Sequence, residues 1–227
     1  MFRKIILVIF SFLLLSCQDK TDKLKFEKEV AYEIFPLIIK KLHSDIRLGN
    51  PPPPPEINYD EKGNYIEMDS LEMAIHLTEY NKEKIKLYKD SLKLVIAISD
   101  STYLLTIEEK NSLLIHFSEY KIKLDTVDNS TKYKIDIDKI RADDKLKFKY
   151  LSEFPEGSEI WKRKKNYDFF LNGATGFSRI QFDKTHSFGV LTSNYTVGPL
   201  NGFGVLVFIY KLNGKWLIDE IVTTTIS

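Results

Sequence analysis

Four apolar segments in the last third of the chain decide the fold. They are GFSRIQF (176–182), SFGVLTSNYT (187–196), GFGVLVFIY (202–210) and KWLIDEIVT (215–223). All four are rich in β-branched and aromatic residues, which pack well on the pleated, half-buried surface of a sheet. Each segment also has the usual length of a strand. We therefore expect four successive β-strands between residues 176 and 223.

The connections between these segments are short. Asp183-Lys184-Thr185-His186 joins the first two, and Asn213-Gly214 joins the last two. Asn-Gly is a strong signal for a two-residue hairpin, because both residues tolerate a positive φ angle. Consecutive strands joined by such turns pair as antiparallel neighbours. The last third therefore predicts a curved antiparallel β-sheet meander.

Upstream of the sheet, the spacing of apolar residues becomes helical. Apolar side chains at three- and four-residue intervals predict an amphipathic helix over residues 24–42, which Pro36 should kink or split. Its apolar stripe consists of Phe26, Val30, Ile34, Leu37, Ile38 and Leu42. Five prolines follow at residues 51–55. We interpret them as a stiff polyproline II spacer, and a ligand for an aromatic-lined groove is the alternative.

A second helix is expected in the middle of the chain. Asp69 and Glu72 have the spacing of a capping box, and a helical pattern then continues to about Asp90. Its stripe consists of Leu71, Ala74, Ile75, Thr78, Ile85 and Tyr88. The continuous apolar run 94–98 follows and predicts a buried strand.

Three shorter elements are expected before the last third. Thr106 and Glu109 form a second capping-box pattern, which predicts a short helix through Phe117. Alternating polar and apolar residues over 133–137 and 146–150 predict two half-exposed strands. Helices that precede a curved antiparallel sheet are typical of an α+β domain.

The amino terminus has the layout of a secretory signal. Arg3 and Lys4 precede an apolar run from Ile5 to Leu15. This run is about half the roughly twenty apolar residues that a membrane-spanning helix needs. Basic residues ahead of a short apolar core are typical of a signal peptide.

Leu14-Leu15-Ser16-Cys17 resembles the lipobox of bacterial lipoproteins. The resemblance implies that a peptidase cuts before Cys17, that its thiol carries a diacylglycerol, and that its amino group is acylated. Several acyl chains, palmitate among them, give stable membrane anchoring where one gives only marginal binding. Cys17 is the single cysteine, so it has no disulfide partner within the chain. The alternative is an ordinary signal peptide followed by a chance cysteine.

This interpretation divides the chain into three parts. Residues 1–16 are the expected lipoprotein signal peptide. Residues 17–56 form the expected lipidated tether, helix and polyproline spacer, and residues 57–227 the single α+β domain.

The carboxy-terminal part resembles a module of uncharacterised lipoproteins of Bacteroidota. The resembling motifs are Phe177-Ser178-Arg179-Ile180-x-Phe182, Gly198-Pro199-Leu200-Asn201-Gly202-Phe203-Gly204 and Leu212-Asn213-Gly214-Lys215-Trp216-x-Ile218. Curved sheets of the cystatin-like and ketosteroid-isomerase-like kinds also end in an Asn-Gly-Lys-Trp hairpin. The resemblance implies a cell-envelope compartment and a curved sheet, and it implies no particular reaction. Gln18 is unlike the aspartate that retains enterobacterial lipoproteins in the inner membrane, which favours the outer membrane.

Catalytic, metal and nucleic-acid sites are not expected. None of the four histidines, at positions 43, 76, 116 and 186, has a second His or Cys three or four residues away. The Gly-x-Ser-x-Gly elbow of serine hydrolases is absent. A net charge of +1, with one dense basic run at Lys162–Lys165, does not fit a nucleic-acid binder. We expect no catalytic residues, no metal and no cofactor.

Two function classes therefore remain. The first is a non-catalytic binding or envelope-interaction lipoprotein, held on the membrane through the acyl chains on Cys17. In it, Tyr195, Phe203 and Tyr210 are the aromatic candidates for contact with a ligand or protein partner. The second is an immunity or inhibitor lipoprotein that neutralises a toxin or hydrolase at the envelope. A small-molecule enzyme is a third alternative.

Overall fold

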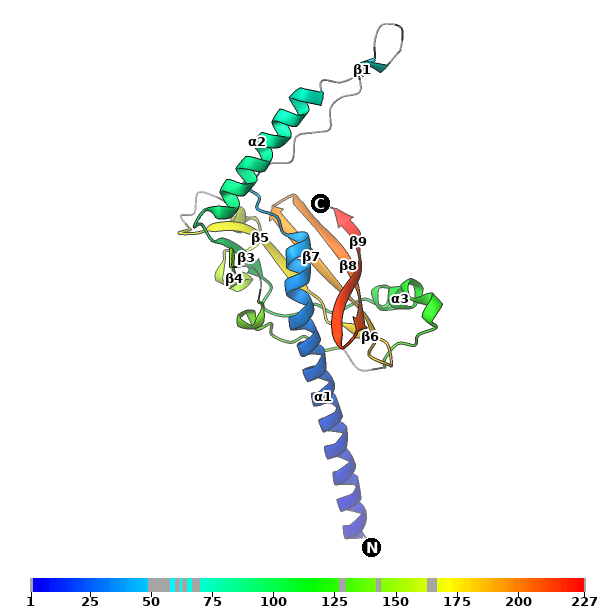
Figure 1. Ribbon diagram of the computed structural model, residues 1–227. Coiled ribbons are helices and arrows are strands. Elements are labelled where there is room, and N and C mark those ends of the chain that lie inside the picture. Colours follow the sequence, from blue (N-terminus) through cyan, green and yellow to red (C-terminus); the bar gives the residue numbers. More distant parts are fainter. Residues whose placement is uncertain are drawn as a thin grey trace.

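The computed structural model describes residues 2–48, 58–59, 62, 65–66, 70–126, 130–141, 144–162 and 167–226. For residues 2–21, 58–59, 65–66 and 70–73 it describes the backbone alone. Figure 1 shows helices followed by one open, twisted sheet, which confirms the predicted α+β class. The helices are α1 (Phe2–Leu42), α2 (Ser70–Lys89) and α3 (Ile107–His116), with four 3-10 helices, η1 (Ser118–Tyr120), η2 (Ile137–Lys139), η3 (Leu151–Glu153) and η4 (Gly157–Trp161).

Seven of the nine described strands form the central sheet. Its order is β4-β3-β5-β7-β8-β9, with β6 paired to β7 beside this path. The strands are β3 (Leu94–Ile98), β4 (Leu146–Tyr150), β5 (Phe170–Phe177), β6 (Gln181–Phe182), β7 (Phe188–Gly198), β8 (Asn201–Leu212) and β9 (Lys215–Ile226). Strands β1 (Asn58–Tyr59) and β2 (Tyr65–Ile66) form a separate antiparallel pair.

The antiparallel part of the sheet follows the predicted turns. At the β8–β9 hairpin, Asn213 and Gly214 both have positive φ angles, of 51° and 82°, as the Asn-Gly signal requires. Strands β3, β4 and β5 depart from the predicted meander, because β3 runs parallel to both of its neighbours. The sheet is therefore mixed at one edge and antiparallel from β5 to β9.

Side chains alternate between two covered faces of the sheet. The C-terminal half of α1 covers one face, where fully buried Ile34, Phe35 and Ile38 pack on Ile96 and Phe177 in the largest apolar cluster. On the opposite face, Leu113 of α3 and Phe117, which follows it, pack on β7 and β8. Residues 154–161 and 167–169 cover β3 and β5 on the same face. The result is a three-layer body with α1 on one side.

Helix α1 continues through Pro36, so the helix is not split there. The buried side chains on both sides of Pro36 stabilise the helical backbone against the loss of one hydrogen bond. Leu37 is exposed, so it lies off the buried stripe to which the sequence pattern assigned it.

Two predicted strands are wrong in their extent. The segment 176–182 is divided, since β5 ends at Phe177 and β6 begins at Gln181; between them, the Ile180 N–H donates to Glu27 of α1. Residues 133–137 form an isolated bridge at Lys134 and then enter η2, and the Asp136 N–H donates to the hydroxyl of Tyr32. In both places a side chain of α1 accepts a hydrogen bond from a backbone N–H that would otherwise donate to a neighbouring strand.

Helix α2 projects from the body at the end opposite the amino terminus (Figure 1). Its capping box at Asp69 lies outside the described residues. From Ala74 to Lys89 the side chains are exposed, apart from half-buried Tyr80 and Leu87. The stripe of Ile75 and Ile85 is therefore on the surface, at 50% and 54% exposure.

Candidate functional site

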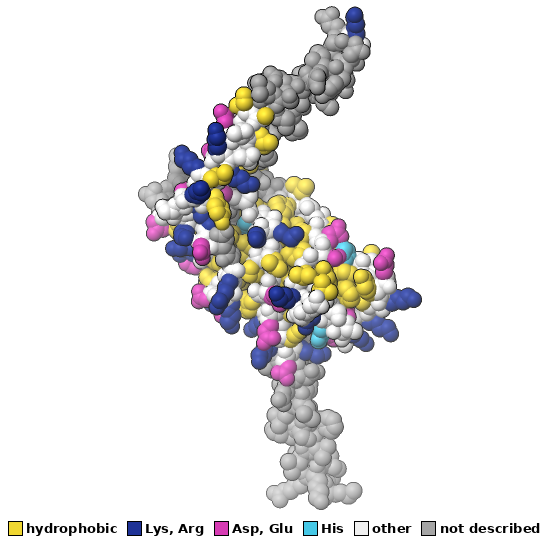
Figure 2. Space-filling view, in the orientation of Figure 1, with side chains coloured by type: hydrophobic (Ala, Val, Ile, Leu, Met, Phe, Trp, Pro, Cys, Tyr) yellow, Lys and Arg dark blue, Asp and Glu magenta, His cyan; other side chains and the backbone are white. Residues whose placement is uncertain are grey.

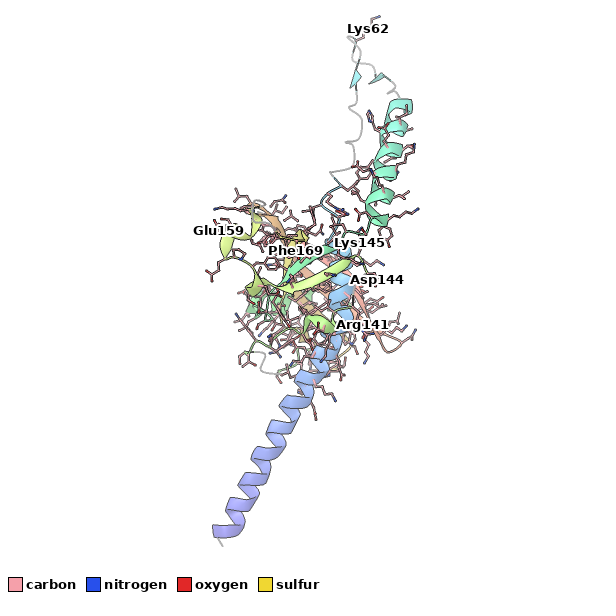
Figure 3. The ribbon with its side chains drawn as sticks, turned by 90° about the vertical axis from the view of Figure 1, so that its left-hand side faces the viewer. Lys62, Arg141, Asp144, Lys145, Glu159 and Phe169 are labelled. Carbon is pink, nitrogen blue, oxygen red and sulfur yellow. The ribbon has the colours of Figure 1, made fainter. Side chains whose placement is uncertain are left out.

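The candidate site is a groove on the sheet face opposite α1. Its floor comes from β5 and β7, one side from residues 99–103, which follow β3, and the other side from η3 and η4. Figure 3 labels Glu159 of η4, at the left edge of the body. The cavity volume is about 730 Å³, within the range of about 300–1,000 Å³ that is usual for small-molecule sites.

Polar groups gather on the floor and on one side of the groove. Asn194 and Thr196 project from β7 on the face opposite Tyr195, and neither side chain forms a hydrogen bond with the described residues. The hydroxyls of Ser99 and Tyr103 are hydrogen-bonded to each other. Asp100 accepts hydrogen bonds from the backbone N–H and the hydroxyl of Ser152, at 3.0 and 2.7 Å. The floor thus offers donors and acceptors that are still available to a ligand.

The other side of the groove is apolar. Phe154 and Ile160 are buried, and Trp161 is half-buried at the groove and also lines a smaller cavity of about 260 Å³. Tyr167 and Phe169 stack near this smaller cavity with ring centroids 5.0 Å apart. An aromatic side facing a polar floor is suited to a ligand with one apolar face and several hydroxyls.

Gly176 makes room for the Ser99–Tyr103 pair. A Cβ atom at this position would lie 2.7 Å from the Ser99 hydroxyl and closer still to the Tyr103 hydroxyl. Any larger residue would push the Tyr103 side chain toward the cavity. The glycine of β5 therefore sets the shape of the groove beside its hydroxyl pair.

The groove lining contains two carboxylates, Asp100 and Glu156, and no basic residue, histidine or cysteine among the described residues. Activation of a serine hydroxyl needs an adjacent general base of suitable pKa, such as a histidine. Ser99 and Ser152 instead bond to a phenol and to a carboxylate. The described lining is consistent with binding, and its net negative charge disfavours an anionic ligand.

The three aromatic residues predicted from the sequence do not form one site. Tyr195 and Phe203 lie together on the α1 face, with ring centroids 5.6 Å apart, and Tyr195 is only 6% exposed. Burial raises the pKa of Tyr195 to about 12, and its hydroxyl donates to the Asn172 carbonyl. Tyr210 packs at the α3 cluster on the opposite face. Tyr195 therefore lies in the core, and the candidate groove lies on the opposite face of the sheet.

The histidines have structural partners or are buried. His116 of α3 lies 2.6 Å from Asp219 of β9, and His186 lies 3.0 Å from Asp125. His43 packs on the ring of Tyr195, with 4.1 Å between centroids. Within the described residues, no group of three His, Cys, Asp or Glu side chains is arranged to hold a metal ion.

Cys17 lies within α1, and its side chain is outside the described set. Across the described part of the chain, no helix combines the length and apolar character needed to cross a membrane.

Comparisons with protein-family models, with curated proteins and with solved structures find no match to this chain.

Sequence reasoning missed the groove because its lining is collected from four separate segments. Asn194 and Thr196 were within a predicted strand, and Trp161 was next to the basic run that begins at Lys162. The only local signal was the polar character of the alternate positions 192, 194 and 196, which share one face of the strand.

Proposed function

We propose that the protein is an outer-membrane lipoprotein with a non-catalytic binding role, anchored through acyl chains on Cys17. The groove on the sheet face opposite α1 supports this proposal, since it pairs an aromatic side with available polar groups. The ligand that fits this chemistry is uncharged and rich in hydroxyl groups, such as a short oligosaccharide.

The geometry of α1 is compatible with such an anchor. Cys17 precedes Glu27, the first buried residue among the described side chains of α1, by ten residues, or about 15 Å at 1.5 Å per helical residue. Acyl chains on Cys17 would therefore hold the body close to one leaflet, with α2 pointing away from the membrane.

Replacement of Cys17 by alanine is expected to release the protein from the membrane. Without the thiol, no diacylglycerol can be attached to the chain. Fractionation of cells that express the wild-type and Cys17→Ala chains measures this effect. If the variant still sediments with outer membranes, lipid anchoring through Cys17 is wrong. Protease treatment of intact cells then distinguishes a surface-exposed wild-type protein from a periplasmic one.

Ligand binding in the groove can be followed through tryptophan fluorescence. The chain has two tryptophans, of which Trp161 lines the groove and Trp216 is 3% exposed in the core. Titration of the wild-type protein in phosphatidylcholine nanodiscs with maltotriose, chitotriose and xylotriose is expected to give a saturable change for at least one of them. Asn194→Ala should weaken this binding about tenfold, as one lost hydrogen bond of roughly 1–1.5 kcal/mol implies.

Thr223→Ala, at an exposed position on β9, is the matched control and should bind as the wild type does. If none of the three sugars changes the fluorescence, or if Asn194→Ala binds them equally well, the groove is not a saccharide site.

The immunity or inhibitor role is favoured by one other observation, the projecting helix α2. Figure 2 shows hydrophobic side chains on this helix among charged ones, and Ile75, Leu77, Ile85 and Tyr88 are all at least 43% exposed. Exposed apolar side chains of this kind mark protein-interaction surfaces. In that case Ile75→Glu, and not Asn194→Ala, should abolish the protein's effect at the envelope.

A further inference from the structure

A second cavity lies on the other side of the sheet, where α1 ends and α2 meets the body. This interhelical pocket has a volume of about 700 Å³. It is walled by the end of α1 and the turn after it, by α2, and by the first residues of β3 and β4. None of the residues that line the groove contributes to it.

The wall of the interhelical pocket is mainly apolar. Leu48, Leu87, Leu94 and Leu146 are buried or half-buried along it, together with the half-buried ring of Tyr80. Leu37 of α1, at 37% exposure, and Tyr88 of α2, at 66%, lie at the same cavity. A hydrocarbon segment placed here would cover apolar surface that the described fold leaves in contact with water.

Three cations from three different elements surround this apolar wall. They are Lys40 of α1, Lys84 of α2 and Arg141, which precedes β4. None of the three forms an ion pair or hydrogen bond with the described residues, and all three are exposed. Figure 3 shows Arg141 and Lys145 on the same side of the body, with Lys145 close to the base of α2.

The other charges at the pocket already neutralise one another. Asp45 accepts from Arg47, with Nε at 2.8 Å, and Asp90 accepts from both Arg47, at 2.6 Å, and Lys145. Hydrogen bonds from Lys145 and Arg47 lower the pKa of Asp90 to about 2, so it remains ionised near neutral pH. Asp45 and Asp90 are therefore not available to compensate the three remaining cations.

The helix ends do not account for these cations either. The negative end of a helix dipole attracts basic side chains to its last carbonyls. At α2, Lys145 Nζ already donates to the carbonyls of Leu87 and Asp90, at 2.7 and 2.8 Å. At α1, the His43 N–H donates to the Ile39 carbonyl at 2.9 Å. Lys40, Lys84 and Arg141 thus form a surplus of positive charge around an apolar cavity.

We propose that the interhelical pocket binds an organic anion with an apolar tail, of the chemical class of acyl carboxylates and alkyl phosphates. The tail lies against the leucines of the pocket, and the anionic head lies among Lys40, Lys84 and Arg141. This site is independent of the groove, whose carboxylates select against anions.

The test uses the full chain in phosphatidylcholine nanodiscs and a photoreactive dodecanoate that carries a diazirine in its tail. After irradiation, mass spectrometry locates the labelled peptides. Labelling is expected on residues 36–48 and 80–88, and the uncharged diazirine dodecanol should label them several-fold less. Equal labelling by the alcohol would mean that the cations play no part and would overturn the proposal.

Two variants make the result specific. Lys84→Gln combined with Arg141→Gln should reduce dodecanoate labelling about five- to tenfold, since the variant removes two of the three cations around the anionic head. Lys82→Gln, an exposed lysine of α2 that does not line the pocket, is the matched control and should label as the wild type does. Unchanged labelling in the double variant contradicts the proposal.

Competition then identifies the head group. Unlabelled dodecanoate and dodecyl phosphate are added separately, and the one that displaces the photoprobe at lower concentration has the preferred head. Displacement by neither would show that the labelling is non-specific. Since Asn194→Ala should leave dodecanoate labelling unchanged, failure of the saccharide test and failure of this proposal are distinguishable.

Discussion

Replacement of Glu27 by alanine is expected to lower the free energy of unfolding by about 3–5 kcal/mol, which is the usual cost of removing one partner of a buried ion pair. Glu27 and Arg179 are 3% and 4% exposed. The carboxylate accepts from Arg179 Nε at 2.7 Å and from its terminal nitrogen at 2.6 Å. It also accepts from the Ile180 N–H at 2.9 Å. The substitution leaves a guanidinium and a backbone donor buried without this acceptor.

The effect should be large because this pair joins α1 to the sheet. Arg179 also donates to the Thr131 carbonyl and lies over the ring of Tyr133, at 5.5 Å from its centroid. Through these contacts, Glu27 of α1 fixes the position of the segment between β5 and β6. Urea unfolding followed by the fluorescence of Trp216, which is buried beside Phe26 of α1, measures the change.

Two further variants make the prediction specific. Glu29→Ala, at an exposed position of the same helix, should change stability by less than about 0.5 kcal/mol. The double variant Glu27→Leu/Arg179→Met should regain most of the lost stability, because apolar residues of similar volume can replace a buried pair. If Glu27→Ala costs less than about 1 kcal/mol, the ion pair does not hold α1 on the sheet.

The same ion pair marks the limit of prediction from this sequence. Local signals were sufficient where a turn or cap is formed by neighbouring residues. Asn213-Gly214 forms the expected hairpin, and Thr106 with Glu109 forms the expected capping box at α3. The break in the strand predicted over 176–182 depends on Glu27, which is 152 residues from Arg179, so no pattern near the break could indicate it.

Local sequence patterns also did not predict the register or the direction of the strands. The run 94–98 was predicted as a buried strand, but its parallel pairing with β4 and β5 is set by the chain connections on both sides. The candidate site shows the same limit. Tyr195 was chosen because it is aromatic, whereas the residue beside it, Asn194, faces the groove. A strand pattern separates odd from even positions, and it does not say which face remains open after the helices have packed.

The alternation of β7 also explains why the two candidate sites remain separate. Tyr195 packs toward α1 and His43, near the interhelical pocket, while Asn194 and Thr196 face the groove. A Cβ atom at Gly173 of β5 would lie 2.5 Å from the Tyr195 ring, so glycine is needed there for the ring to enter the core. Ligands on the two faces would therefore be separated by the thickness of the sheet.

Acidification is expected to destabilise the protein through His43. Burial lowers the pKa of His43 to about 3, below its ordinary value of 6.5. Neither ring nitrogen has a hydrogen-bond partner among the described residues. The unfolded chain therefore binds a proton between pH 6.5 and 3 that the folded chain does not bind. The stability contributed by neutral His43 is fully present above pH 6.5 and is lost as the pH falls toward 3.

The size of this effect follows from the linkage relation. Each pH unit below 6.5 costs about 1.4 kcal/mol, so stability should fall by about 2 kcal/mol between pH 7 and pH 5 from this group alone. The pH dependence of the whole protein also includes its other titratable groups. The contribution of His43 is therefore measured as the difference between the wild type and His43→Leu, by urea unfolding at both pH values.

His43→Leu removes the titrating group and keeps an apolar side chain against the ring of Tyr195. At pH 7 it should be as stable as the wild type or more stable, because a buried ring without hydrogen-bond partners is replaced by a group that needs none. At pH 5 its advantage should be about 2 kcal/mol larger than at pH 7. His76→Leu, at an exposed position of α2, is the control for replacing a histidine by leucine. If wild type and His43→Leu lose stability in parallel, then His43 accepts a proton in the folded state, and the end of α1 opens to water more readily than its packing on Tyr195 implies.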